Sequence, residues 1–334
     1  MSEDSRPRTV RELGEFALID LINAGREQAA QVLLGPGDDA ALLAAPDGRF
    51  VVSTDMLVEG RHFRLDWSAP IEIGRKAIAQ NAADIVAMGA RPSGFVVALG
   101  CPADTPVAVV TGLADGLWAE AGRAGGSIVG GDLVRSDHLV ISVTAFGDLG
   151  GQAAITRAGA GIGDTVAVAG ELGWSAAGLA AFTGGADLSA PAFAHALAAH
   201  RVPQPPYAAV LDIAGGAAPT ALTDVSDGLL ADLGHLAAAS GIAIDVHSAA
   251  LADPELTALA RLLDADAAQW ILAGGEDHAF AGTWPAGAGL PAGWRPIGVV
   301  GAGSGVTVDG AVPAGGTGWE SFRGADSTST GRNR

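Results

Sequence analysis

The stretch TALTDVSDGLLADLGHLAAASG, residues 220–241, passes from a strand-like run through an acidic turn into a helical pattern. TALTDV is short, apolar and partly β-branched, which favours a strand, and SDG supplies turn-forming residues. Small and apolar residues then continue to Gly241, a residue type that is typical of helix ends. Strand, acidic turn and helix form a unit that recurs along the chain, and this unit predicts an α/β architecture.

Outward from this stretch, the pattern divides the chain into two halves. Before Gly150, helices are expected over residues 12–24, 71–88 and about 106–123. Strands are expected at QVLL (31–34), at SIVGGD (127–132), which should end in a glycine turn holding Asp132, and at LVISVTAFG (139–147). After Gly150 the pattern restarts with a loop, the strand TVAVAG (165–170) and a helix of small residues.

The restart after Gly150 predicts an α/β (α+β) fold with two domains. The N-terminal domain should span residues 1–150 and the C-terminal α/β domain residues 151–322. The low-complexity segment GADSTSTGRNR closes the chain, so residues 323–334 are expected to form a disordered tail.

Two apolar runs, ALLAA (41–45) and FVVST (50–54), flank the turn residues PDGR (46–49), which predicts a β-hairpin. In that register Asp39 lies nearly opposite Asp55, with Cβ atoms roughly 5 Å apart. Two carboxylates at this separation repel, and the pKa of one rises unless a cation lies between them. The hairpin therefore predicts a divalent metal ion between Asp39 and Asp55.

The composition limits the classes of function. With 334 residues, 49% of them hydrophobic, the chain can bury sizeable cores. A formal charge of −18 argues against a nucleic-acid partner, since such binding depends on Lys and Arg. The single cysteine, Cys101, excludes an internal disulfide, and the opening MSEDSRPRTV lacks the apolar core of a secretory signal. We therefore expect a cytoplasmic protein, and no apolar window is long enough to predict a membrane segment.

Common nucleotide-binding and hydrolase motifs are absent or poorly placed. GPGDDA (35–40) satisfies a relaxed dinucleotide pattern, but a predicted hairpin follows it instead of the helix that must receive the pyrophosphate. Lys76, the only lysine, precedes Ala where a Walker A loop requires Ser or Thr. No HExxH or GxSxG motif is present, and Cys101 is more typical of a buried apolar position than of a nucleophile.

What remains is a set of aspartates in or beside predicted turns, at positions 38, 39, 55, 84, 132, 224 and 227, several of them flanked by Gly, Ser or Thr. Gln80 and Asp84 share one face of the helix predicted over 71–88, so Asp84 can project towards a site. Any one of these aspartates is equally typical of a turn or helix cap. As a set, hard carboxylate and hydroxyl oxygens suit Mg²⁺ bridging to nucleotide phosphates.

Seven blocks, in order, resemble the successive motifs of thiamine-monophosphate kinases. They are GPGDDAALL, STDMLVEGRHF, NAADIVAMGARP, IVGGD, RAGAGIGD, TDVSDGLLADL and GGEDH, and the resemblance runs from Gly14 to Phe322. It implies the two-domain fold of aminoimidazole ribonucleotide synthetase, with the N-terminal sheet at the interface of a homodimer. It also implies direct, in-line transfer of the γ-phosphoryl group of ATP to thiamine monophosphate, giving thiamine diphosphate, with several Mg²⁺ ions bound.

The resemblance assigns roles to individual residues. Mg²⁺ would be held by Asp39, Ser53, Thr54, Asp55, Asp84, Asp132, Asp224 and Asp227. ATP would contact Gly131, Asp132, Arg157 and Ser226, and the thiamine phosphate would contact His62, Glu276 and Trp319. The catalytic residues implied are Asp55, Asp84, Asp132 and Arg157. Simpler roles stay open for three of these: His62 as a structural histidine, Arg157 as a surface charge and Trp319 as a core anchor.

Two blocks depart from the family pattern. Glu-Asp-Tyr-Glu-Leu is replaced by EDHAF, residues 276–280, and Pro-x-Pro-Arg by PQPP, residues 203–206. The first change affects the substrate side of the site and the second a peripheral basic residue. The sequence leaves two other functions open: a different enzyme of the same fold, and a regulatory module that binds nucleotide or metal without turnover. Selenide-type enzymes and hydrogenase-maturation factors use a cysteine or selenocysteine near a chain end, which Cys101 does not match.

Overall fold

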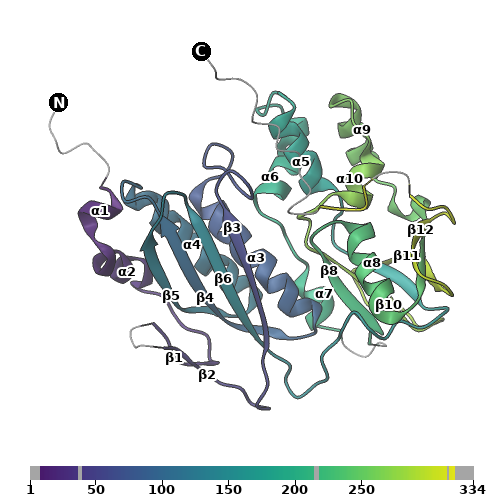
Figure 1. Cartoon of the computed structure of the whole chain (residues 1–334), viewed down its shortest axis with the longest axis horizontal. Helices are drawn as coiled ribbons and strands as arrows, with labels where there is room; N and C mark the ends of the chain where they lie inside the picture. Colours follow the sequence, from purple (N-terminus) through teal and green to yellow (C-terminus); the bar gives the residue numbers. More distant parts are fainter. Residues whose placement is uncertain (1–7, 37–39, 214–217, 314–315, 320–334) are drawn as a thin grey trace.

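The computed structural model of the chain describes residues 8–36, 40–213, 218–313 and 316–319. Within these ranges the strands form two main sheets, one from each half of the chain, and a separate strand pair, β1–β2. Figure 1 shows the two sheets next to each other, with helix α3 between them. The elements before residue 150 are α1 Val10–Leu13, α2 Glu15–Asn23, β1 Val32–Leu34, β2 Leu42–Leu43, β3 Val51–Val58, α3 Pro70–Ala87, β4 Arg91–Cys101, α4 Val107–Ala124, β5 Ser127–Arg135 and β6 Val140–Asp148.

The second half begins with β7 and forms a six-stranded sheet in the order β12-β9-β11-β7-β10-β8. Its α-helices and strands are β7 Thr165–Ala169, α5 Trp174–Thr183, α6 Ala194–Arg201, α7 Tyr207–Leu211, β8 Ala221–Val225, α8 Leu229–Ser240, β9 Ala243–Val246, α9 Pro254–Leu262, α10 Ala267–Ala273, β10 Ala279–Trp284, β11 Trp294–Gly301 and β12 Gly305–Val308. The strand and helix predicted within residues 220–241 are confirmed as β8 and α8, and Gly241 ends α8 with a left-handed backbone (φ 68°).

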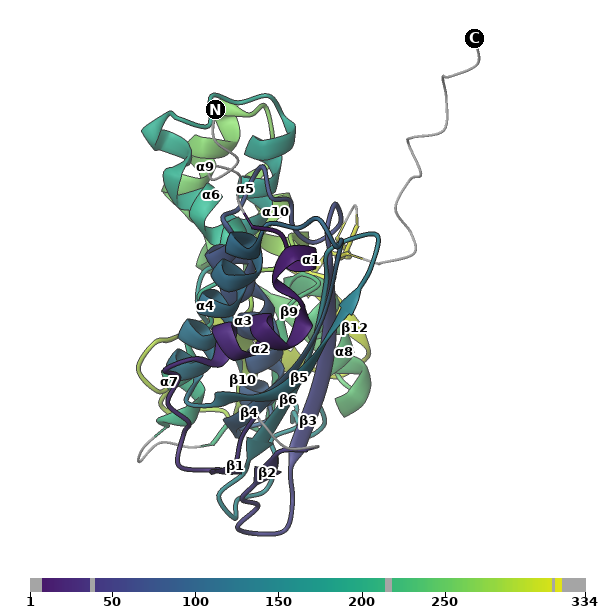
Figure 2. The ribbon, with the colours of Figure 1, turned by 90° about the vertical axis from the view of Figure 1, so that its left-hand side faces the viewer.

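The first sheet has the order β3-β6-β4-β5. Figure 2 shows α3 and α4 covering one of its faces, while no helix of the described residues covers the other, which is called the open face below. The two helices pack closely because each has a glycine at the contact. A Cβ atom on Gly74 would lie 2.1 Å from the Leu113 carbonyl oxygen, and one on Gly116 would lie 2.0 Å from that of Ile71. The helices predicted over 71–88 and 106–123 are thus confirmed, and glycine sets their separation.

The hairpin predicted around residues 46–49 is wrong. Strand β3 pairs antiparallel with β6 over its whole length, from Val51 opposite Gly147 to Val58 opposite Val140. Strand β2 has only two residues and pairs with β1 instead. The eight-residue β3 gains a full ladder of hydrogen bonds from the long β6, which the short ALLAA run could not provide. Asp39 lies outside the described residues, so its predicted pairing with Asp55 no longer has a basis.

The glycine turn predicted to hold Asp132 is also wrong, because β5 continues through Gly130 and Gly131 to Arg135. The pairing of β5 with β4 shifts by one residue near Gly130, so an irregularity absorbs the glycines without ending the strand. A Cβ atom on Gly131 would lie 2.0 Å from the Val97 carbonyl oxygen, which explains a glycine at that position. Asp132 therefore lies within a strand, and its side chain is exposed.

Helix α3 joins the two halves. It contacts β3, β4 and β6 of the first sheet and also β8, α6 and α7 of the second half. Most of its residues are buried, among them Ile73, Ala77 and Ile78. Polar side chains on such a helix must find partners, and they do so where the two halves meet. Among the described residues, no helix has both the length and the apolar character needed to cross a bilayer.

Candidate active site

Strand β3 sorts its side chains onto two faces. Ser53 and Asp55 alternate with Thr54, so the first two point towards α3 and Thr54 points to the open face of the sheet. The Ser53 hydroxyl donates to Asp84 Oδ2 at 2.6 Å, and the Asp55 amide donates to Asn81 Oδ1 at 3.1 Å. Both acceptors belong to α3. The predicted ligands Ser53, Asp55 and Asp84 therefore lie together on the helix side of the sheet.

The second half of the chain adds Asp224, which is 2% exposed on β8. His278 Nδ1 lies 3.3 Å from Asp224 Oδ2. Burial opposes protonation of His278, but the hydrogen bond and charge of Asp224, with Glu276 and Asp84, outweigh it and raise the pKa of this histidine. His278 stands where the family pattern has an aromatic residue, and here it contacts one of the predicted metal ligands.

The three carboxylates of this cluster repel one another. Burial, together with the charges of Asp224 and Asp55, raises the pKa of Asp84 to about 7. The pKa of Asp55 is also raised, chiefly by burial and further by Asp224, while His278 and a hydrogen bond from Gln80 oppose the rise. Half-buried carboxylates with raised pKa values and a neighbouring hydroxyl form a hard-oxygen donor set, which fits Mg²⁺.

Two other predicted ligands are not brought to this cluster. The Thr54 hydroxyl donates to the Val143 carbonyl oxygen at 2.9 Å on the open face of the first sheet. Asp132 lies on the same face of β5, at the opposite edge of the sheet from β3. Three strand spacings separate these edges, roughly 14 Å, whereas two ligands of one Mg²⁺ ion lie within about 4 Å of each other. Asp132 and Asp55 of one chain therefore cannot share an ion in this arrangement. Gly131, a predicted ATP contact, also lies on β5, next to Asp132.

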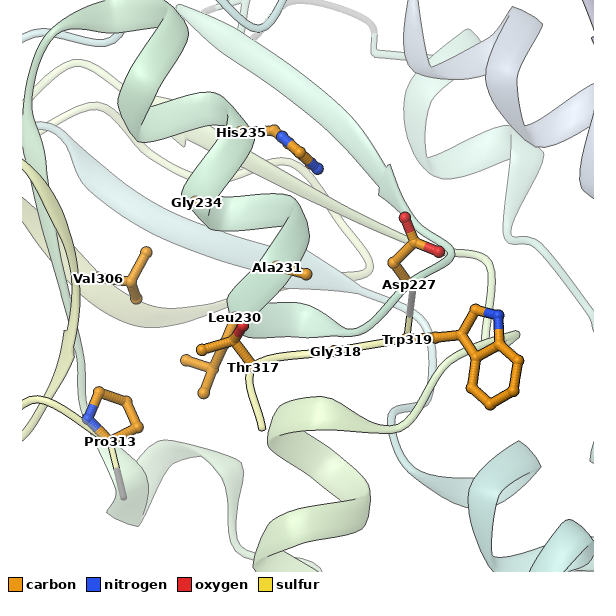
Figure 3. Close-up of a pocket in the computed structure, with 10 residues that line it drawn as sticks. All are labelled: Asp227, Leu230, Ala231, Gly234, His235, Val306, Pro313, Thr317, Gly318 and Trp319. Carbon is orange, nitrogen blue, oxygen red and sulfur yellow. The ribbon is translucent and has the colours of Figure 1, made fainter. Parts of the chain in front are cut away.

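The acidic turn after β8 borders a cavity of about 530 Å³. Figure 3 shows Asp227 and Trp319 at one end of it, with helix α8 alongside. The Trp319 amide donates to the Asp227 carbonyl oxygen at 2.8 Å. The side chain of Trp319 is 62% exposed, which weighs against the alternative role of a core anchor. The structure thus brings Trp319 to the turn that carries the predicted metal ligand Asp227.

Arg157 lies beside the same turn. Its Nε donates to the Thr223 hydroxyl at 3.2 Å, one residue before Asp224. Burial and Asp224 raise the pKa of Asp227, and Arg157 is one of the charges that oppose this rise. Arg157 is exposed, yet its position at the acidic turn is specific. The sequence alone could not show whether Arg157 lies at this turn or is an ordinary surface charge, because nothing in RAGAGIGD predicts a contact with β8.

Asp232 holds the acidic turn in place. Its carboxylate accepts hydrogen bonds from the amides of Asp227 and Gly228, both at 3.1 Å, at the start of α8. Burial, followed by the charges of Asp224 and Asp227, raises the pKa of Asp232 to about 7. Sequence reasoning did not select this residue, although an aspartate in the first turn of a helix is a recognisable capping signal.

The predicted substrate residues His62 and Glu276 meet through Lys76, which the sequence reasoning had set aside. Lys76 is 2% exposed, and its Nζ donates to the His62 carbonyl oxygen at 3.1 Å and to Glu276 Oε2 at 3.0 Å. Burial would raise the pKa of Glu276, but the charge and hydrogen bond of Lys76 lower it. The Glu276 amide also donates to the Ser226 carbonyl oxygen at 2.7 Å. The only signal for Lys76 in the sequence was its rarity.

His200 completes this group. Its Nδ1 lies 3.5 Å from Glu276 Oε2 and 3.2 Å from the Ser175 hydroxyl. Burial, with the nearby charge of Lys76, lowers the pKa of His200 to about 4, so it is neutral at physiological pH. His62 accepts a hydrogen bond from the Val58 amide through Nδ1, which fixes its ring next to β3. Part of the role of His62 is thus structural, as the alternative interpretation held.

Comparison with known proteins gives consistent matches. The family described as "AIR synthase related protein, N-terminal domain" matches residues 37–149. Thiamine-monophosphate kinase of Mycobacterium tuberculosis (strain H37Rv) is 55% identical over 317 residues, covering 94% of this chain and 93% of the relative. The enzyme of the same name from Corynebacterium glutamicum is 46% identical over 323 residues, covering 94% and 95%. A solved structure described as AaThiL complexed with AMPPCP and TMP superposes with a TM-score of 0.77 at 33% identity, covering 95% of this chain and 100% of that one.

Proposed function

The chain belongs to the thiamine-monophosphate kinase family, and from this membership we propose that it transfers the γ-phosphoryl group of ATP to the phosphate of thiamine monophosphate, giving thiamine diphosphate. The similar structure that holds AMPPCP, an ATP analogue, together with TMP supports both substrates. Within the chain itself, the observation that carries the proposal is the cluster of the buried Asp224 with the half-buried Asp55 and Asp84 at the junction of the two halves.

The cluster, with Ser53 and Asp227 beside it, is suited to hold several Mg²⁺ ions. Bound there, Mg²⁺ would offset the charge of two phosphate chains that otherwise repel each other. Arg157 adds a fixed positive charge at the acidic turn, where the ATP phosphates would lie. His278 restrains the Asp224 carboxylate, and Gln80 restrains that of Asp55. Transfer is direct and in line, so no covalent phosphoenzyme is required.

The acceptor would be held by His62, Glu276 and Trp319. Thiamine monophosphate carries a flat, cationic thiazolium ring, which suits both a carboxylate and the face of an indole. Glu276 and Trp319 are anchored by backbone hydrogen bonds to the consecutive residues Ser226 and Asp227. The acceptor phosphate can therefore point towards the aspartate cluster while the rings remain at the turn.

We further propose a homodimer formed through the open face of the first sheet. That face exposes apolar side chains: Val52 and Met56 are each 54% exposed and Val134 is 51% exposed. An exposed apolar sheet face of this kind is typical of an interaction surface. A second copy placed across it could bring its own Asp132 to the β3 edge of this sheet, next to the strand that carries Asp55, which the Asp132 of the same chain does not reach.

Two broader assignments accompany this function. Residues 1–150 would form the ATP, Mg²⁺ and dimerisation domain, and residues 151–322 the domain that closes over the nucleotide. We place the enzyme in the cytoplasm, where ATP is available. The one cysteine, Cys101, is buried and unpaired, in keeping with a reducing compartment.

The direct test is to mix the protein with ATP, Mg²⁺ and thiamine monophosphate and to look for thiamine diphosphate by chromatography. Unphosphorylated thiamine should be a poor acceptor, because the nucleophile is a phosphate oxygen. Excess chelator should stop the reaction. ATP consumption without thiamine diphosphate, or equal turnover of thiamine, would overturn the assignment.

A further inference from the structure

Lys76 is buried at the meeting point of three segments that are distant in sequence. Its ammonium donates to the carbonyl oxygens of His62 and His200, at 3.1 and 3.3 Å, and to the Glu276 carboxylate at 3.0 Å. An ammonium group has three N–H donors, so each has an acceptor here. The contact therefore joins α3 to the loop after β3, to the end of α6 and to the loop before β10.

Helix α3 places Lys76 in line with the cluster of aspartates that we propose as the metal site. Lys76, Gln80 and Asp84 follow one another at intervals of four residues, so they lie along one face of the helix. Gln80 hydrogen-bonds the Asp55 carboxylate, and Asp84 accepts from Ser53. One rigid helix face thus carries the Lys76 contact at one end and the aspartate cluster at the other.

The second half of the chain presents a matching row. Glu276 contacts Lys76, while His278, two residues later, contacts Asp224 of the metal cluster. Glu276 and His278 both have left-handed backbones, with φ of 65° and 50°. Non-glycine residues adopt this conformation rarely and at an energetic cost. Contacts such as that of Lys76 with Glu276 must therefore hold the loop in this shape.

We propose that Lys76 is a positioning residue for the acceptor substrate: its ammonium fixes the Glu276 carboxylate and the His62 loop relative to Asp84, so that thiamine monophosphate lies along α3 with its phosphate at the metal cluster. This inference rests on the proposed function, since it concerns the acceptor of that reaction. Lys76 acts through Glu276 and His62 and is not itself placed on the reacting atoms.

The test compares Lys76→Met and Lys76→Arg with Arg75→Met as a matched control. Arg75 precedes Lys76 on α3 and also pairs with a buried carboxylate, that of Glu120, which keeps Arg123 as a second partner when Arg75 is replaced. Removing a charged hydrogen bond from a binding site typically changes affinity by about tenfold or more. We expect Lys76→Met to raise KM for thiamine monophosphate by at least about tenfold, with KM for ATP changed by less than about twofold.

Lys76→Arg should raise the KM for thiamine monophosphate by less than Lys76→Met does, because arginine keeps the positive charge. The KM should still exceed that of the parent, because a planar guanidinium cannot meet three acceptors in the same geometry. Arg75→Met should lower the melting temperature and leave both KM values unchanged. Calorimetric titration of thiamine monophosphate into enzyme with a non-hydrolysable ATP analogue should reproduce the KM order as a Kd order. These comparisons separate positioning from a general loss of folded protein.

An unchanged KM for thiamine monophosphate in Lys76→Met, or an equal change in both KM values, would overturn the inference. If Lys76→Met does not fold, Lys76→Arg decides the matter by the same criterion. A parent enzyme that makes no thiamine diphosphate would instead overturn the proposed function, so the two failures can be told apart.

Discussion

Among single residues, Asp84 makes the stability of the metal-free protein depend on pH. Its pKa is raised to about 7 by burial and by Asp224 and Asp55, whereas an aspartate in an unfolded chain titrates near pH 4. Between these values the folded chain binds more protons at Asp84 than the unfolded chain does. The contribution of Asp84 to stability therefore falls as pH rises from about 4 to about 7, and then levels off.

Asp84→Asn should remove this pH dependence, because an amide does not ionise. In chelator, we expect the variant to melt above the parent at pH 8, and the difference to shrink as the pH approaches 4. With Mg²⁺ present, turnover of the variant should fall by orders of magnitude, and Mg²⁺ should raise the melting temperature of the parent but not that of the variant. A variant that melts below the parent at pH 8 would show that the carboxylate is stabilised by contacts other than a metal ion.

Trp319 offers a second test at a single residue. Because its side chain is 62% exposed, truncation should cost little stability. If the indole face holds the cationic ring of the acceptor, Trp319→Ala should raise KM for thiamine monophosphate about tenfold, as for the loss of a cation–π contact. KM for ATP should change little, and Trp319→Phe should retain much of the affinity. A large fall in melting temperature with both constants intact would instead mark the residue as an anchor.

At the scale of elements, the crossing of α3 and α4 depends on two glycines that face each other's helices. Gly74→Ala would place a methyl group 2.1 Å from the Leu113 carbonyl oxygen, so the helices would have to move apart. We expect a loss of roughly 1–3 kcal/mol in the free energy of unfolding, as for overpacked cores. Because α3 also carries Lys76 and Asp84, the KM for thiamine monophosphate should rise as well.

The control for this substitution lies on α4. Gly122 has no atom within 4 Å of an added Cβ, so Gly122→Ala should stabilise the helix, by about 0.5–1 kcal/mol. Both free energies are measured by urea denaturation. If Gly74→Ala and Gly122→Ala behave alike, close packing at Gly74 does not set the position of α3.

Elements were predictable from sequence where the pattern is local, and less so where pairing is distant. Helical spacing predicted α3, α4 and α8, and the shared face of Gln80 and Asp84 predicted that Asp84 projects from α3, where it accepts a hydrogen bond from Ser53 of β3. Strand pairing failed for β3, because its partner β6 lies about ninety residues away and a nearby turn looked like a hairpin. The contacts of Lys76 could not be predicted from the sequence either, since its acceptors come from three separate segments.

At the scale of the whole molecule, the separation of Asp55 from Asp132 predicts that the active site is shared between two chains. Asp55→Asn and Asp132→Asn should each be nearly inactive. Unfolding and refolding them together in equal amounts makes half of the dimers mixed. If each site takes Asp55 from one chain and Asp132 from the other, one of the two sites in a mixed dimer is intact.

The mixture should therefore recover about a quarter of the parent activity. Light scattering of the parent protein checks that it is dimeric under the assay conditions. No recovery from a dimeric mixture would show that Asp132 serves its own chain, through a movement of β5 that this arrangement does not contain. Recovery would show that an isolated chain has an incomplete site.

Because the only lysine, Lys76, is buried, its chemical reactivity can report how often the protein interior opens. A small amine-acylating reagent finds a single side-chain target, and that target is sealed between α3 and the loop before β10. Acylation of Lys76 can proceed only during moments when those segments part, as hydrogen exchange does at a protected amide. The acylation rate, measured by mass spectrometry, therefore reports the frequency at which the junction between the two halves opens. Bound substrates should lower this rate.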